Sequence, residues 1–279
     1  MARVSVERLT PIVDAADLRV REYLRLKEGD LFRGLDARSP HGAFICEGHF
    51  VVEHLLAGRY PCRSVLVASS KVEAYGELLA RVAAGVPIYT VDEAVMESIV
   101  GFKFHRGIMA AGSRPGPRDA AACDAVLRAA PAAVVLEDLT NIDNVGGIFR
   151  CVSALAPEGT VIVLSPGCAD PLYRKAIRVS MGHALRVEFV TLSPWDDAME
   201  RLAAAGFTTL ALTPSADAEV LSETSGRVAL VLGSEGPGLS AATMQRAARR
   251  VRIPQREGVD SLNVMVAGAI AMAMVFRPS

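Results

Sequence analysis

The chain has 279 residues, of which 51% are hydrophobic and 22% charged, and its formal net charge is −1. This composition excludes a mostly disordered chain and is typical of a globular protein. The near-neutral charge gives no global argument for binding nucleic acid. The length is sufficient for two domains or for one large domain.

The cysteines show neither a paired framework spacing nor a CxxC motif, which indicates a reducing compartment and argues against a structural zinc site. The five histidines have no metal-ligand spacing either. The N-terminus lacks an apolar signal region, and the longest apolar run, VMVAGAIAMAMVF, is too short to cross a membrane. We therefore expect a cytoplasmic protein without a metal site or a membrane span.

In the first half of the chain, apolar strands alternate with amphipathic helices from about residue 40 onward. The pattern predicts strands at 44–50, 64–69, 87–92 and 105–112, and helices at 51–58 and 71–85. Such alternation is typical of an α/β unit. The Pro-, Gly- and Ala-rich stretch 113–124 predicts a linker.

A second alternating series follows the linker. It predicts strands at 132–139, 160–165, 185–192, 208–213, 227–233 and 249–254, with helices after 141–147 and at 171–182, 195–206, 240–248 and 261–276. These strands are apolar along their whole length, as in a parallel sheet that is covered on both faces. We predict two α/β domains, 1–115 and 125–279.

Three polar or glycine-rich loops follow predicted strands of the second half, at the sheet edge where open parallel sheets bind ligands. In the first, NIDNVGGIFR, Gly146 and Gly147 would allow a backbone or ligand to approach closely. Arg150 lies one helical turn further and can reach toward whatever occupies the loop. The alternatives are that Arg150 is an ordinary surface residue and that Asn144 caps a helix.

The second loop, GSEGPGLS, is neither a dinucleotide fingerprint nor a Walker loop. Glu235 disfavours a phosphate cradle and suits a ligand with a cationic part, such as the sulfonium of S-adenosylmethionine. The alternative is a tight turn with Ser240 as a helix cap. In the third loop, QREGVDSLN, Ser261 is a reasonable N-cap, but capping does not explain Asn263, which needs a backbone or ligand partner.

Together, and in this order, the three loops resemble the SpoU/TrmH family of RNA 2'-O-ribose methyltransferases, within the knotted SPOUT class. The matching stretches are Asn144-x-Gly146-x-x-x-Arg150, LGSEGPGL at 232–239 and IPQREGVDSLNVMVA at 253–267. RVSMGHALRVEF resembles the central Ser-Met-Gly segment of the family. In the first half, FICEGHFVVEHLL and FHRGIMA resemble a small RNA-binding domain related to ribosomal protein L30e.

The resemblance implies a C-terminal trefoil knot, which periodicity alone would not predict. It also implies S-adenosylmethionine as cofactor and a homodimer whose active site uses both subunits. The positions that match the cofactor pocket are Leu232, Gly233, Gly238, Ile253 and Leu262. The polar positions that match the surroundings of the methyl acceptor are Asn144, Arg150, Glu235, Ser261 and Asn263.

Methyl transfer to a ribose hydroxyl requires that this weak acid be oriented and lose its proton near the transition state. Arginine is effectively always protonated, so we expect Arg150 to orient and stabilise the 2'-oxygen and the adjacent phosphate. The proton acceptor stays open between RNA phosphate, water and a strongly perturbed Arg150. Glu235 would face the sulfonium or fix a loop, and the structural role is preferred. Ser261 and Asn263 are expected to position substrate and loop.

Several residues depart from the family pattern and put the substrate subtype in question. Ile142-Asp143 stand where the family often has Pro-Gly, Gln255 replaces a frequent methionine, and Met265 replaces a small polar residue. In the first half, Lys103, His105 and Arg106 form a basic patch flanked by Phe102 and Phe104. We expect the patch to bind RNA, since cations and rings together hold phosphates and stack bases. The alternative is that the two phenylalanines form one buried face of a strand.

The sequence thus favours an S-adenosylmethionine-dependent enzyme that methylates a ribose 2'-hydroxyl in structured RNA, with ribosomal RNA preferred over transfer RNA. A non-catalytic RNA-binding protein with the same fold is the alternative. A third possibility is an unrelated parallel-sheet nucleotide-binding protein, which the missing Walker and dinucleotide fingerprints disfavour.

Overall fold

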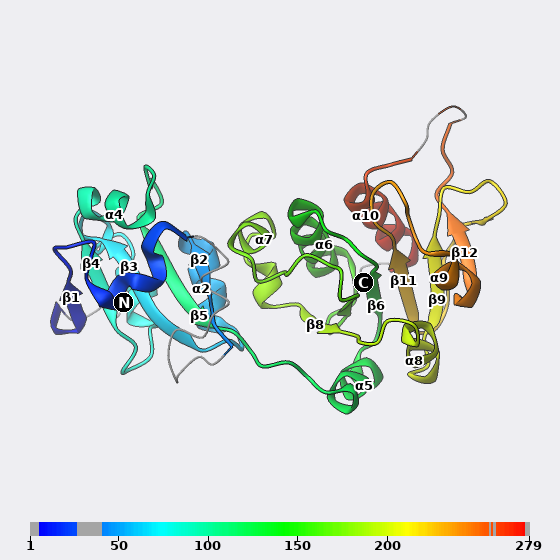
Figure 1. The fold of residues 1–279 in the computed structure, drawn as a ribbon, viewed down its shortest axis with the longest axis horizontal. Helices are drawn as coiled ribbons and strands as arrows, with labels where there is room; N and C mark the ends of the chain where they lie inside the picture. The colour runs from blue at the N-terminus through cyan, green and yellow to red at the C-terminus, as the bar shows by residue number, and fades with distance from the viewer. Residues whose placement is uncertain (1–5, 27–40, 257, 259–260, 277–279) are drawn as a thin grey trace. The chain divides into compact units, whose positions relative to one another are not determined.

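The computed structural model describes residues 6–26, 41–256, 258 and 261–276 (Figure 1). Contacts between residues divide the chain into two compact units. The first consists of Met1–Gly116 with Leu172–Arg186, and the second of Pro117–Pro171 with Val187–Ser279. The domain limits 1–115 and 125–279 stay a prediction, because the segment Leu172–Arg186 groups with the first unit by its contacts.

The first unit contains a mixed five-stranded sheet in the order β1-β4-β3-β5-β2. The strands are β1 (Leu9–Pro11), β2 (Ala43–Glu47), β3 (Cys62–Ala68), β4 (Ile88–Val91) and β5 (Ile108–Ser113). β4 pairs in parallel with β1 and β3, whereas β5 is antiparallel to β2 and β3. The predicted strand 44–50 is too long: it ends at Glu47, since Gly48 has a φ of 93° and starts a helix.

Short helices surround this sheet. They are η1 (Val6–Arg8), η2 (Leu18–Leu26), α2 (His49–Ala57), η3 (Ser69–Lys71), α3 (Gly76–Ala80), α4 (Glu93–Val100), α7 (Arg174–Val179) and η4 (His183–Leu185). The predicted helix 71–85 is wrong in extent, because only α3 within it is α-helical. α4 was not predicted. Its buried side chains Met96 and Ile99 pack with Val20 and Tyr23 of η2 over β-strand residues such as Leu66.

The second unit contains a seven-stranded sheet in the order β10-β12-β9-β11-β6-β7-β8, and all its pairs are parallel. The strands are β6 (Ala133–Leu136), β7 (Val161–Leu164), β8 (Glu188–Thr191), β9 (Thr208–Leu212), β10 (Glu219–Val220), β11 (Val228–Leu232) and β12 (Arg249–Arg252). Residues of β6, β7 and β11 are buried throughout. The prediction of a parallel sheet covered on both faces is therefore confirmed.

Helices cover both faces of this sheet (Figure 1). On one face, Val135 and Val231 pack with Leu127 of α5 (Ala120–Ala129) and Leu202 of α8 (Ala198–Ala204). α6 (Ile142–Leu155) and α10 (Val264–Val275) pack against each other, and α10 also contacts β11. α9 (Ala241–Arg246) precedes β12. The predicted linker 113–124 is wrong in its last part, because the Asp119 side chain accepts the Ala122 N–H at 2.8 Å and caps α5.

The close approach of α6 and α10 depends on Gly147. This residue lies inside α6 and not in a ligand loop as its sequence context predicted. A Cβ added to Gly147 would lie 2.9 Å from Cγ of Met265 and would also collide with its sulfur. Met265, which departs from the family pattern, therefore fills the space that the glycine leaves.

We expect Gly147→Ala to lower the free energy of unfolding by about 1–3 kcal/mol, the usual cost of overpacking. In the double variant Gly147→Ala, Met265→Ala the new methyl group gains room, so the two effects should couple by more than about 0.5 kcal/mol. Denaturant unfolding of the wild type, both single variants and the double variant measures this coupling. Strictly additive effects would contradict the contact.

Candidate active site

A cavity of about 580 Å³ lies at the carboxyl edge of the parallel sheet. Its walls come from the segments that follow β9, β11 and β12 and from the start of α10. All five positions assigned to the cofactor pocket line it: Leu232, Gly233, Gly238, Ile253 and Leu262. Glu235, Ser261 and Asn263 line it as well. Loops far apart in the sequence thus meet where open parallel sheets bind ligands.

The loop after β11 folds back tightly on itself. Gly238 N donates to Ser234 O at 3.1 Å, so Glu235 stands at an exposed turn. A Cβ on Gly233 would lie 2.7 Å from Gly238 O and would collide with the adjoining backbone atoms. Only glycine allows this approach of backbone to backbone. Ser240 accepts the Thr243 N–H at 3.2 Å and caps α9, as the alternative interpretation of this loop expected.

Three polar side chains join the three loops. Asn144 Nδ2 donates a hydrogen bond to Glu235 Oε1. Asn263 Nδ2 donates to the same oxygen at 3.2 Å and to Asn144 Oδ1 at 3.2 Å. Asn144 is 5% exposed, so its side chain needs such partners. The carboxylate of Glu235 thus holds both amides, and this supports its loop-fixing role.

The two helix caps considered as alternatives, at Asn144 and Ser261, are wrong. Asn141, and not Asn144, caps α6 by accepting the Asp143 N–H at 2.9 Å and the Asn144 N–H at 3.4 Å. Asn263, and not Ser261, caps α10 through its Oδ1 atom. Asn263 therefore uses its oxygen for the helix and its amide N–H groups for Glu235 and Asn144. These bonds explain why a polar residue, Asn263, stands at the start of an otherwise apolar helix.

Arg150 lies apart from this polar group. It is exposed on α6, and the cavity lining in the described part of the chain does not include it. Within the described residues its guanidinium has no hydrogen bond and no ion pair. It lies six positions after Asn144, which places the two side chains on different faces of the helix. The structure therefore brings together four of the five residues assigned to the methyl acceptor, and Arg150 is not among them.

Gln255 contributes a buried acceptor to the cavity. It follows β12, lines the cavity and points a side-chain oxygen, Oε1, to a position shielded from solvent. Within the described residues no donor reaches this oxygen. An unsatisfied buried acceptor costs about 1–3 kcal/mol, which a donor on a bound ligand would offset. Gln255, noted in the sequence only as a departure, is thus a candidate ligand contact.

Comparison with known proteins identifies the chain. The profile of the SpoU rRNA Methylase family matches residues 131–273, and that of the RNA 2'-O ribose methyltransferase substrate-binding domain matches residues 45–117. The chain belongs to the SpoU rRNA methylase family. The three loops described above all fall within the first of these matches.

Relatives of this SpoU chain are described as RNA methyltransferases. An uncharacterized tRNA/rRNA methyltransferase of Mycobacterium tuberculosis is 37% identical over 266 residues, covering 93% of this chain and 89% of the relative. A 23S rRNA (guanosine-2'-O-)-methyltransferase of Acinetobacter baylyi is 27% identical over 195 residues, covering 67% and 77%. The fold is shared with an AdoMet-bound rRNA methyltransferase from Sinorhizobium meliloti, with a TM-score of 0.73, 22% identity, and 95% and 96% of the two chains covered.

A buried carboxylate anchors the Glu235 loop of this SpoU protein. Glu137, which follows β6, is 4% exposed. Its Oε1 accepts from Trp195 Nε1 at 3.1 Å and Thr243 Oγ1 at 3.0 Å, and its Oε2 accepts from Ser240 N at 3.2 Å. Sequence reasoning missed Glu137. The available signal was an acidic residue directly after a fully apolar strand, a position that requires partners.

We expect Glu137→Ala to lower the free energy of unfolding by about 3 kcal/mol, because three donors lose the buried carboxylate that accepts from them. The affinity for S-adenosylmethionine should fall as well, since the loop that carries Glu235 loses its anchor. Denaturant unfolding and calorimetric titration measure the two effects. Glu158→Ala, on an exposed loop, is the matched control and should change stability by less than about 0.5 kcal/mol. Equal stability of both variants would contradict the anchoring role.

Two cysteines of the second unit are shielded from solvent in part. Burial raises the pKa of Cys151, and the Arg150 guanidinium only partly opposes the shift. Burial also raises the pKa of Cys168. Within the described residues, no group of three or more His, Cys, Asp or Glu side chains is placed to hold a metal ion. In the same part of the chain, no helix is long and apolar enough to span a membrane.

The predicted RNA-binding residues Lys103, His105 and Arg106 lie between α4 and β5 and are all exposed. Arg106 Nη1 donates to Glu47 O at 3.1 Å, which holds the side chain at the start of α2. Phe102 is 40% exposed and lies outside any strand, so the alternative of a buried strand face is wrong.

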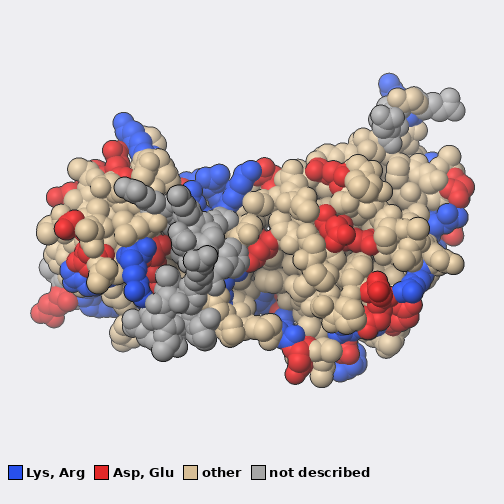
Figure 2. Space-filling view, in the orientation of Figure 1, with Lys and Arg blue, Asp and Glu red and all other residues tan. Residues whose placement is uncertain are grey.

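An aromatic group that sequence reasoning missed stands next to Arg106. Tyr75 OH donates to Arg106 O at 2.8 Å, and the Tyr75 ring lies 5.4 Å from that of His49. The neighbouring Phe50 is 61% exposed. On the face drawn in Figure 2, acidic and basic side chains are interspersed. A predicted contact with RNA therefore depends on small groups of side chains such as this one.

Proposed function

We propose that this SpoU protein transfers a methyl group from S-adenosylmethionine to a ribose 2'-hydroxyl of structured RNA, with ribosomal RNA preferred over transfer RNA. The joining of Asn144, Glu235 and Asn263 at the edge of a ligand-sized cavity carries the proposal. Family membership supports methyl transfer to RNA. The 23S rRNA (guanosine-2'-O-)-methyltransferase of Acinetobacter baylyi supports the 2'-hydroxyl and ribosomal RNA.

The cavity suits S-adenosylmethionine in size and in chemistry. Its volume of about 580 Å³ falls within the usual range for small-molecule sites. The buried Gln255 Oε1 requires a donor, and the adenine amino group, the ribose hydroxyls and the methionine ammonium all provide donors. The fold neighbour from Sinorhizobium meliloti binds AdoMet, which supports the same cofactor here. When bound, this cofactor supplies a methyl group activated on a sulfonium.

In the proposed reaction, Leu232, Ile253 and Leu262 enclose the cofactor, and Ser261 and Asn263 position the ribose at the mouth of the cavity. Glu235 is the one carboxylate among the described residues that line the cavity, and both asparagine amides already bind it. We therefore assign Glu235 to positioning. The proton of the 2'-hydroxyl then leaves to water or to an RNA phosphate.

Arg150 completes the proposed site from a second subunit. Its guanidinium lies outside the cavity lining of its own chain and has no partner within the described residues. The adjoining helix α10 exposes Val266 (41%) and Ile270 (37%), which lie four residues apart on one face. Exposed apolar side chains in such an arrangement are typical of an interface. We propose a homodimer in which Arg150 of one subunit orients the 2'-oxygen and adjacent phosphate at the cavity of the other.

Further parts of the proposal rest on the family resemblance. They are the C-terminal trefoil knot, the L30e-like character of the first unit and a cytoplasmic location. RNA contact through Lys103, His105 and Arg106 is supported by the exposed aromatic side chains beside them.

Transfer of labelled methyl from S-adenosylmethionine to total RNA tests the function, with ribosomal and transfer RNA separated afterwards. We expect label in ribosomal RNA, on alkali-resistant 2'-O-methyl nucleotides. Label confined to transfer RNA would correct the substrate. Label on bases would overturn the ribose assignment. Absence of both label and cofactor binding would favour a non-catalytic RNA-binding protein.

A further inference from the structure

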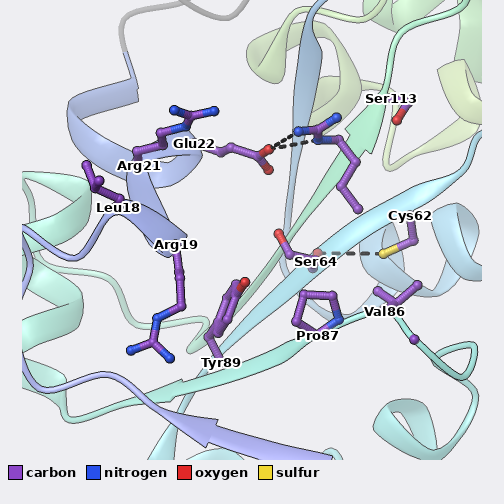
Figure 3. A pocket seen from close by; sticks show the side chains of 12 residues that line it. Leu18, Arg19, Arg21, Glu22, Cys62, Ser64, Val86, Pro87, Tyr89 and Ser113 are labelled. Carbon is purple, nitrogen blue, oxygen red and sulfur yellow. Dashed lines mark hydrogen bonds and ion pairs between the residues drawn. The ribbon is translucent and has the colours of Figure 1, made fainter. Parts of the chain in front are cut away.

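The first unit has a cavity of its own, of about 540 Å³ (Figure 3). Its walls are η2, the N-terminal ends of β3 and β4, and the end of β5. The aromatic and basic surface around Arg106 lies at the other end of β3, roughly 20 Å away by the rise of a seven-residue strand. The η2 wall also precedes residues 45–117, the part matched by the substrate-binding profile. This cavity is therefore distinct from the predicted RNA-binding patch.

A buried ion pair forms one wall of the cavity. Arg63 Nε donates to Glu22 Oε1 at 2.7 Å, and Arg63 Nη2 lies 2.5 Å from the same oxygen. The two side chains are 9% and 10% exposed. The second carboxylate oxygen, Glu22 Oε2, is buried and has no hydrogen-bond partner within the described residues. A buried charged acceptor of this kind requires a donor.

Arg19 provides a cation at the same cavity. Asp17 binds it through Nε at 3.0 Å and Nη2 at 2.5 Å, and these bonds lower the pKa of Asp17 to about 2. The pair therefore stays ionised and fixes the direction of the guanidinium. Its Nη1 donors have no partner within the described residues, and the side chain is 50% exposed. The exposed Arg19 guanidinium can therefore bind a phosphate, whereas the neighbouring Glu22 and Arg63 side chains stay buried.

Apart from Arg21 of η2, the remaining lining residues are apolar or neutral. Tyr89, Pro87 and Val86 line the side that belongs to β4 and the loop before it (Figure 3). On the β3 side, burial raises the pKa of Cys62 to about 12, so its thiol adds no negative charge to the cavity. Flat apolar and aromatic walls suit a planar ring.

We propose that this cavity binds one unpaired nucleotide of the RNA substrate, with the base N–H groups donating to Glu22 Oε2 and the phosphate on Arg19. This inference rests on the proposed function for the identity of the RNA. The required chemistry is a planar ring with N–H donors linked to an anion, which is that of a ribonucleotide. Guanine offers the most to one carboxylate, because its N1–H and its amino group lie side by side. The site gives the protein a second contact with RNA, at the opposite end of β3 from Arg106.

Titration of the full-length protein with GMP, UMP and guanosine, followed by NMR or calorimetry, tests the site without any methyl transfer. We expect GMP to bind more tightly than UMP, and guanosine to bind about tenfold more weakly than GMP because it lacks the charge-assisted phosphate bond. Arg19→Ala should weaken GMP binding about tenfold and leave guanosine binding unchanged. Glu22→Gln replaces an acceptor with a donor and should remove the preference for GMP over UMP. No detectable GMP binding would overturn the proposal.

Arg81→Ala is the matched control. Arg81 is 45% exposed and pairs with Glu53 at 2.6 Å, as Arg19 does with Asp17, but it does not line the cavity. It should leave GMP affinity and the KM for RNA at wild-type values. Equal GMP affinity of Arg19→Ala and Arg81→Ala would overturn the site even if Glu22→Gln failed to fold.

The RNA assay separates this inference from the proposed function. Arg19→Ala should raise the KM for RNA several-fold, with kcat and the affinity for S-adenosylmethionine unchanged. Active methyl transfer with an unchanged KM in Arg19→Ala would show that the cavity does not hold the RNA substrate, while the enzyme function would stand. GMP binding by a wild-type protein that does not methylate RNA would instead overturn the proposed function and leave a nucleotide site.

Discussion

Arg150→Ala is expected to reduce methyl transfer by about 10²–10³-fold, the usual loss when one preorganised charged donor to the reacting oxygen is removed. The affinity for S-adenosylmethionine should stay close to the wild-type value, because Arg150 does not line the cavity of its own chain. Single-turnover transfer and calorimetric titration of the cofactor separate these quantities. Arg150→Lys keeps the charge but loses the planar guanidinium that can donate two parallel hydrogen bonds, so it should recover only part of the rate.

Arg128→Ala controls for the loss of an exposed arginine, since Arg128 lies in the last turn of α5, away from the cavity. It should transfer methyl groups at the wild-type rate. Loss of cofactor binding in a normally folded Arg150→Ala protein would contradict the role assigned to Arg150.

A mixing experiment tests the two-subunit site. Arg150→Ala and Gly233→Ala proteins, each inactive alone, are unfolded or dissociated together and reassembled in equal amounts. Half of the dimers are then hybrids, and one site in each hybrid combines an intact Arg150 with an intact cavity, so about a quarter of the wild-type activity should return. No recovery in a mixture shown to contain hybrids would place Arg150 at the cavity of its own subunit.

Gly233→Ala is expected to weaken the binding of S-adenosylmethionine by more than about 100-fold, equivalent to about 2.8 kcal/mol. The added Cβ would lie 2.7 Å from Gly238 O, and the colliding atoms belong to backbone, which cannot rotate away as a side chain can. The turn that carries Glu235 would have to open. Because Gly233 and Gly238 both line the cavity, this movement changes its wall directly. Calorimetric titration of the cofactor measures the effect.

Gly76→Ala is the matched control for this substitution. Gly76 begins α3 in the first unit, and a Cβ built there has no heavy atom within 4 Å. It should change neither stability nor cofactor affinity measurably. Cofactor binding by Gly233→Ala at the wild-type level would show that the Gly238 turn has room to move and that the close approach is not required.

The sequence by itself determined the parallel sheet, the place of the cavity and most of its lining. Uniformly apolar strands such as 161–164 and 228–232 indicate a sheet covered on both faces, and they are buried throughout. Parallel strands bring their carboxyl ends to one edge, so loops that follow β11 and β12 must meet there. The family resemblance then placed Gly233 and Ile253 at one site on this edge.

Only the tertiary structure decided which polar atoms meet. Asn141 and Asn144 are equivalent as caps in sequence, and the choice between them depends on where α6 begins relative to Glu235. From the sequence, Gly147 is predicted to lie in a loop. In the structure, Met265, more than a hundred residues later, fills the space that a side chain at position 147 would need. Glu137 and Arg150 both look like isolated charges, yet one is buried among three donors and the other is exposed without a partner in the described chain. Periodicity reports the face on which a residue lies, whereas a hydrogen bond or a steric contact depends on residues that only folding brings together.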